Sequence, residues 1–173
     1  TVATRMENIL MIPIIGIQNT MATFAGQNMG ARQPERVSKG LGQGVLVSLF
    51  MTAALCVCQL LGMELIIRAF KLDAAAAAIC RQHLFASVLS EPIFAIYFPA
   101  NGMFQGVGEG FHATFYALMA LGLRVVFAYS LYRTAFFGYT AIWWSQAMAW
   151  SLTLITCYAH FFRGKWKEKS LVS

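Results

Sequence analysis

Two charged residues lie inside long apolar stretches, and they are the first candidates for chemistry. Glu91 lies in the stretch 84–108, and Arg124 lies in the stretch 111–132. A charge at the centre of a membrane-spanning helix costs about 2.5 to 3.5 kcal/mol on insertion scales. Because such a cost is normally offset by a partner or a function, both residues are candidates for a functional or structural role.

Glu91 directly precedes Pro92. Proline removes a backbone donor and clashes with the carbonyl four residues earlier, so Pro92 predicts a kinked or opened helix. A carboxylate beside freed carbonyls would form a cation site. Helical angles place Asn101 and Gln105 on the same polar edge as Glu91, as candidates for cation or solute binding. The alternative is a glutamate that is satisfied by a neighbouring helix and has no transport role.

The stretch 8–31 has a similar polar edge. Gln18 and Asn19 lie near its middle, and Pro13 is expected to bend the helix. Amide side chains at membrane depth need hydrogen-bond partners. Gln18 and Asn19 are therefore candidates for solute binding, with interhelical hydrogen bonding as an equally good interpretation.

For Arg124 a structural role is favoured. Its side chain lies too far from the ends of its stretch to reach the water layer fully. A carboxylate is its natural partner, and Glu91 and Glu109 are the two candidates near the stretches 84–108 and 111–132.

The composition indicates which elements position these side chains. Of the 173 residues, 58% are hydrophobic and 12% are charged, about half the charged fraction of a soluble domain. A membrane-spanning helix needs about 20 apolar residues. We therefore predict an all-α membrane protein with five transmembrane helices in a single domain, residues 1–173. The expected helices are 4–31, 40–63, 82–108, 111–132 and 134–162, followed by a basic tail, 163–173.

The net charge of +6 arises from Lys and Arg residues between the apolar runs and in the tail. Their distribution predicts that the link 32–39 and the C-terminus are cytoplasmic. The basic residues are expected to contact lipid headgroups of the bilayer, not nucleic acid. The four cysteines have no metal-site spacing, and no HExxH or GxSxG motif occurs. We therefore predict no metal site, no catalytic residues and no enzyme activity.

Residues 23–40, TFAGQNMGARQPERVSKG, resemble the multidrug and toxic compound extrusion (MATE) family, in which a helix ends in GQN-x-GA before a short basic link. The matching residues are Gly26, Gln27, Asn28, Gly30, Ala31 and Arg36. The preceding helix is also similar to that family, at Arg5, Glu7 and Pro13. Further resemblance lies in FQGVGEG (104–110, with Gly106), in LGLRVVFAY (121–129, with Arg124) of the DinF-like branch, and in SQAMAW (145–150).

The resemblance implies a fold of twelve helices in two six-helix lobes. This chain, which begins at Thr1 and not at Met, would be the second lobe without its first helix, a fragment whose partner is the missing N-terminal lobe. The family implies secondary active efflux of organic cations, drugs or other amphipathic solutes by Na⁺ or H⁺ antiport. It implies no cofactor beyond that coupling ion, and we expect a bacterial inner (plasma) membrane location.

In some members of that family an acidic residue on the helix that matches 84–108 binds the coupling cation. Glu91 lies on that helix, about one turn before the usual position near Phe94. Three other functions stay open. They are a flippase-type transporter of a lipid-linked sugar, a non-transporting membrane scaffold, and an intramembrane enzyme.

Overall fold

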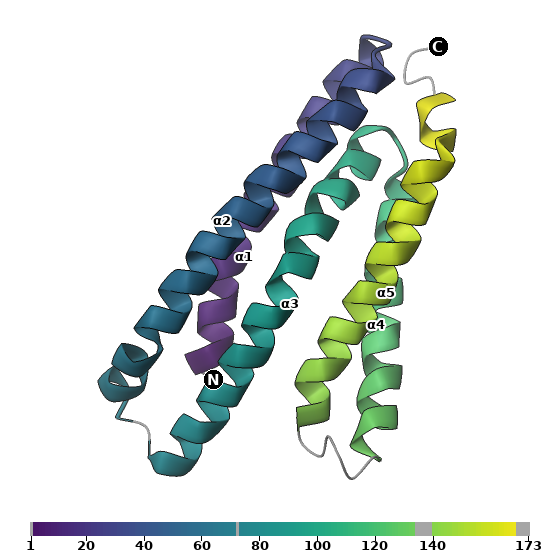
Figure 1. Cartoon of the computed structure of the whole chain (residues 1–173). Coiled ribbons are helices and arrows are strands. Elements are labelled where there is room, and N and C mark those ends of the chain that lie inside the picture. Colours follow the sequence, from purple (N-terminus) through teal and green to yellow (C-terminus); the bar gives the residue numbers. More distant parts are fainter. Residues whose placement is uncertain (1, 72, 134–139, 169–173) are drawn as a thin grey trace.

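The long apolar segments form a helical bundle. The computed structural model describes residues 2–71, 73–133 and 140–168, and within these ranges it contains helices and no strand. The predicted all-α fold with five long helices is confirmed. The helices are α1 (Val2–Gly30), α2 (Pro34–Ala69), α3 (Ala74–Gly106), α4 (Gly110–Tyr132) and α5 (Ala141–Arg163), followed by the short 3₁₀ helix η2 (Lys165–Glu168) (Figure 1).

Helix α3 is at the centre of the bundle. It packs against α1 and α2 on one side and against α5 on the other, while α4 packs mainly against α5. The α1–α2 link, the α3–α4 link and the end of α5 lie toward one end of the bundle, and the α2–α3 link lies at the other (Figure 1). The first of these is called the basic end below, because it carries the predicted cytoplasmic charges of 32–39 and of the end of α5.

Large apolar side chains cover the outer faces of the helices. Leu46, Phe50 and Leu61 on α2 and Phe111 and Leu118 on α4 are each at least 63% exposed. Helices α2, α3 and α4 are long and apolar enough to cross a membrane. Helices α1 and α5 have 29 and 23 residues, which is enough length to span as well. An apolar exterior of this kind fits lipid as the surrounding solvent.

Two helices begin earlier than expected. Helix α2 starts at Pro34 and not at residue 40, with proline in the first turn, where its missing N–H costs nothing. Helix α3 starts at Ala74 and not at 82, and the backbone N–H of Ala76 donates to the Asp73 carboxylate at 2.7 Å. Counting apolar residues between charges therefore underestimates helix length, because these helices continue through the polar residues that flank the apolar stretches. The predicted helix start at 134 and the tail residues 169–173 lie outside the described residues.

The prolines do not interrupt the helices. Helix α1 continues through Pro13, and α3 continues through Pro92 and Pro99. The predicted opening of the helix at Pro92 is therefore wrong. Pro92 is exposed on the outside of the bundle, whereas the neighbouring Glu91 is buried.

Glycines bring α1 and α3 into close contact. A Cβ atom on Gly102 would lie 2.1 Å from the backbone oxygen of Gln18, and one on Gly106 would lie 2.1 Å from that of Ala22. Real Cβ atoms do not approach an oxygen so closely, so only glycine fits here. Gly102 and Gly106 thus form a small-xxx-small pair, which lets two helices approach closely.

Candidate functional site

Glu91 lies on α3 at the centre of the described bundle, and its side chain is 5% exposed. The Cys56 thiol of α2 donates a hydrogen bond to Glu91 Oε2 at 2.7 Å. A carboxylate buried in an apolar bundle is disfavoured in its charged form unless charge or hydrogen bonds compensate it. Binding a proton or a small cation would supply that compensation.

A pocket of about 170 Å³ lies beside Glu91. Its lining mixes polar and apolar side chains from three helices: Asn8, Met11 and Ile14 of α1, Ser87, Glu91 and Phe94 of α3, and Gln146 of α5. Sites for drug-sized ligands measure about 300 to 1,000 Å³. This pocket is therefore too small for a whole drug, but it fits a cation with some of its water.

Helix α2 carries a buried polar stripe that the sequence analysis did not identify. Ser48, Thr52, Cys56 and Gln59 follow one another at helical spacing, and each is at most 8% exposed. The hydroxyls of Ser48 and Thr52 and both amide atoms of Gln59 have no protein hydrogen-bond partner among the described residues. Buried polar atoms without a protein partner commonly bind water or an ion. The stripe thus offers polar contacts above and below the Cys56–Glu91 hydrogen bond.

The amides predicted as ligands instead form an interhelical network. Asn101 Oδ1 accepts from Gln18 Nε2 at 2.9 Å and from Gln105 Nε2 at 2.7 Å. Asn101 Nδ2 donates to the Tyr97 hydroxyl and to the carbonyl of Ala113, both at 2.9 Å. This network joins α1, α3 and α4, which supports the interhelical interpretation of these amides.

The network and the Glu91 pocket are separate. Ten residues of α3 separate Glu91 from Asn101, a rise of about 15 Å. None of Gln18, Asn101 and Gln105 lines the pocket. Asn19 lies apart from both, since its side chain is exposed on α1 and only its carbonyl accepts, from the Thr23 hydroxyl at 3.2 Å.

The GQN-x-GA motif builds the turn between α1 and α2. The Asn28 side chain is buried and donates to the Phe24 carbonyl at 2.8 Å. The Asn28 carbonyl accepts from the Gln33 N–H at 2.8 Å, and Arg32 adopts a φ of +57°. The Arg32 N–H donates to the Met29 carbonyl at 2.9 Å, and with the Gln33 bond this forms a Schellman motif, in which a left-handed residue ends the helix. The motif residues therefore have structural roles in this turn.

The other motif residues lie at the helix contact or on the surface of this turn. A Cβ on Gly26 would lie 3.3 Å from the Gly106 carbonyl, which places it at the α1–α3 contact, whereas Gly30 has open space around it. Gln27 is exposed, and Arg36 donates to Gln33 Oε1 at 3.0 Å.

The expected carboxylate partner of Arg124 is not found. Within the described part of the chain, Arg124 pairs with neither Glu91 nor Glu109. Glu109 is 15 residues away, about 22 Å along α4. Glu91 contacts α2 and a pocket formed by α1, α3 and α5, and no α4 residue lines that pocket. Arg124 is partly exposed on a helix at the edge of the bundle.

A comparison with protein families identifies the chain. The MatE family model matches residues 1–130, which include Glu91, the α2 stripe and the amide network. The chain belongs to the MatE family. No curated protein matches this MatE chain.

A solved structure has the same fold. It is described as an outward-facing conformation of a multidrug resistance MATE family transporter of the MOP superfamily, and it superposes with a TM-score of 0.84 at 15% identity. The match covers 98% of this MatE chain and 39% of that chain. The chain therefore has the fold of part of such a transporter and spans well under half of its length.

Proposed function

We propose that this MatE chain is part of a secondary transporter that exports organic cations or other amphipathic solutes in exchange for Na⁺ or H⁺. We further propose that Glu91 binds the coupling cation. One observation carries this proposal: a carboxyl group 5% exposed at membrane depth borders a pocket large enough for a small cation. Intramembrane carboxyl groups are costly and commonly belong to ion or proton pathways.

The coupling follows from the charge of Glu91. With a proton or Na⁺ bound, the Glu91 site is neutral and is stable in an apolar surrounding; without it, the buried carboxylate is unfavourable. A conformation that admits water to Glu91 therefore favours release. Alternation between two such states links cation movement to solute movement. The polar stripe of α2 would offer hydrogen bonds to water, or oxygen ligands to a cation, on the path to and from Glu91.

The exposed polar face of α1 fits a solute cavity. Asn19, Thr23 and Gln27 recur every four residues and are exposed. Lipid tails offer no hydrogen bonds to such a face. Since the related transporter is much longer than this chain, we propose that the face borders a central cavity shared with the rest of the protein. Asn19 would then act in solute binding, while Gln18 stays in the amide network.

A drug-efflux assay on cells that express the full-length protein tests the proposal. We expect Glu91→Gln to abolish energised efflux at normal expression, because the amide mimics a permanently neutral carboxyl group. The matched control is Glu35→Gln, which removes an exposed carboxylate paired with Lys167 at 2.9 Å and should leave efflux unchanged. Normal efflux by Glu91→Gln would remove Glu91 from coupling.

A further inference from the structure

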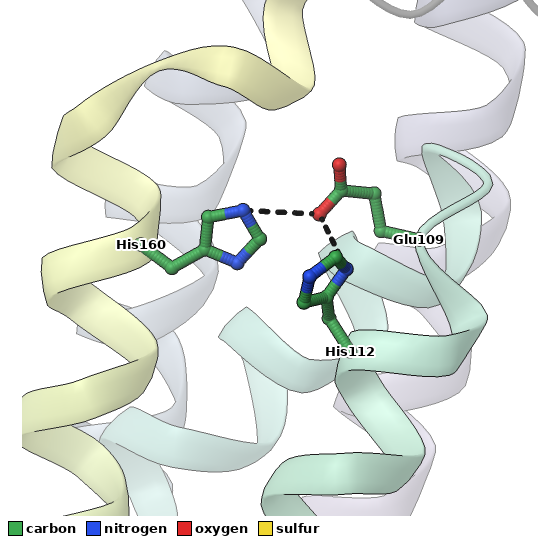
Figure 2. A group of neighbouring side chains, drawn as sticks. All are labelled: Glu109, His112 and His160. Atoms are coloured by element: carbon green, nitrogen blue, oxygen red, sulfur yellow. Dashed lines mark ion pairs between the residues drawn. The ribbon is translucent and has the colours of Figure 1, made fainter.

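Three residues with metal-binding side chains meet at the basic end of the bundle. Glu109 lies in the α3–α4 link, His112 in the first turn of α4, and His160 in the last turn of α5 (Figure 2). One donor atom of each lies within 4.8 Å of the other two. The sequence predicted no metal site, because its cysteines lack metal-site spacing and it has no HExxH motif. His160 is 48 residues from His112, so no local motif reveals this cluster.

The distances fit a tetrahedral metal site. His160 Nε2 lies 3.2 Å and His112 Nδ1 lies 3.4 Å from Glu109 Oε2. With metal–ligand bonds of about 2.1 Å, two ligands of a tetrahedral Zn²⁺ ion lie about 3.4 Å apart. Both separations therefore match an edge of that tetrahedron. Figure 2 shows both rings directed at the same carboxylate oxygen.

The surroundings hold His160 in position. Its Nδ1 lies 2.6 Å from the Tyr116 hydroxyl, and its ring stacks on Phe104 with centroids 4.9 Å apart. With the proton on Nδ1, His160 donates to the Tyr116 hydroxyl, and the lone pair of Nε2 can then bind a metal ion. Outer hydrogen bonds of this kind fix the tautomer and orientation of metal-binding histidines.

The cluster is open to ions from the aqueous side. Glu109 is 6% exposed and His160 is 16% exposed, but His112 is 45% exposed. The next cation along α5, Arg163, is exposed and so is screened by solvent. The site therefore has two largely buried ligands, Glu109 and His160, and one exposed ligand, His112.

We propose that Glu109, His112 and His160 bind one Zn²⁺ ion, with water in the fourth position. Two histidines and one carboxylate form a ligand set that zinc accepts, and three protein ligands leave one position open. The ion would connect the α3–α4 link to the end of α5. This inference is independent of the cation-coupling role of Glu91.

Zinc binding to the full-length protein tests the site directly. The protein is purified in detergent, its histidine-free tag is removed, and metal is stripped with a chelator before titration with Zn²⁺. We expect one more Zn²⁺ per chain than in the double variant His112→Gln/His160→Gln. We also expect Co²⁺ to give the visible absorption of a tetrahedral site, and Zn²⁺ to raise the Tm of the wild type by several degrees.

Two single variants separate a ligand role from a folding defect. Tyr116→Phe keeps the ring but removes the hydrogen bond to His160, so zinc affinity should fall about tenfold. His83→Gln should leave zinc affinity unchanged. His83 stacks on Trp143, and it lies about 40 Å along the helix axis of α3 from the proposed zinc site. Equal Zn²⁺ binding by the wild type and the double variant, with both monodisperse, would overturn the proposal.

Discussion

The hydrogen bond from Cys56 to Glu91 crosses from α2 to α3 at the proposed coupling site. It stabilises the charged carboxylate, so its loss should favour the protonated or cation-bound state. A single hydrogen bond to a charged group contributes about 1.5 to 3 kcal/mol. Since a thiol is a weak donor, we expect the lower part of that range.

Cys56→Ala should therefore lower the cation concentration that gives half-maximal transport by about tenfold, as 1.4 kcal/mol corresponds to a factor of ten. Cys56→Ser keeps a donor at nearly the same place and should stay within about threefold of the wild type. Transport at graded Na⁺ concentration or pH measures this. An identical shift in the alanine and serine variants would show that the hydrogen bond has no such role.

Asn101 is predicted to act on stability and not on coupling. Asn101→Leu keeps the number and branching of the side-chain heavy atoms but leaves the Ala113 carbonyl and the Gln18 amide without their partner. We expect the free energy of unfolding to fall by about 2 to 4 kcal/mol, since each buried unpaired group costs about 1 to 3 kcal/mol. Denaturant titration in detergent micelles checks this.

Asn19→Leu is the matched control for Asn101→Leu. Asn19 is exposed, and its substitution should change the free energy of unfolding by less than about 0.5 kcal/mol. Equal stability of the two variants would contradict the network as described.

The sequence revealed the charged residue of the candidate site but not the weakly polar residues beside it. Glu91 is visible because a carboxylate in an apolar stretch is conspicuous. The α2 stripe was missed because Ser48, Thr52 and Cys56 barely lower local hydropathy, although their four-residue spacing is visible in the sequence. The partner of Arg124 was predicted wrongly because sequence gives neither the rotation of α4 nor its neighbour.

At the scale of the helices, the α1–α3 contact depends on two glycines. Gly102→Ala should lower the free energy of unfolding by about 2 kcal/mol or more, because overpacking a tight contact costs about 1 to 3 kcal/mol. The obstructing atom is the backbone oxygen of Gln18, which cannot rotate away as a side chain would. Denaturant titration with detergent-solubilised protein measures the change.

Gly122→Ala provides the comparison. A Cβ on Gly122 of α4 meets nothing within 4 Å, so alanine there should be neutral or slightly stabilising through its higher helix propensity. A loss at Gly122 as large as the loss at Gly102 would contradict the close approach of α1 and α3.

The helices themselves were largely predictable, whereas the contacts between distant helices were not. Stretches of apolar residues gave the number of long helices but not the starts of α2 and α3. The Glu109–His112–His160 cluster depends on α4 and α5 packing against each other, with His160 turned toward α4. Hydropathy contains no information about that rotation.

At the scale of the whole molecule, the distribution of charge predicts the orientation in the membrane. The basic end carries six Lys or Arg residues among those described, Arg32, Arg36, Lys39, Arg163, Lys165 and Lys167. The opposite half of the bundle carries five, Arg5, Arg68, Lys71, Arg81 and Arg133. Short segments rich in Lys and Arg remain in the cytoplasm. We therefore expect the basic end to be cytoplasmic.

Labelling of single cysteines on intact cells checks this orientation. In a cysteine-free background, Lys71→Cys should react with a membrane-impermeant maleimide added outside. Lys39→Cys should react only after the cells are permeabilised. Both positions are exposed, so the difference reports the side of the membrane. The reverse pattern would invert the assignment.

The most direct test of the central claim is cation-driven solute flux by the purified full-length protein in proteoliposomes. An imposed Na⁺ or H⁺ gradient should drive movement of ethidium, a cationic fluorescent solute. Glu91→Gln should lose at least about nine-tenths of the gradient-driven flux, since losing 1.4 kcal/mol of cation binding already means a factor of ten. It should still bind ethidium. Gradient-driven flux by Glu91→Gln equal to that of the wild type would contradict the account.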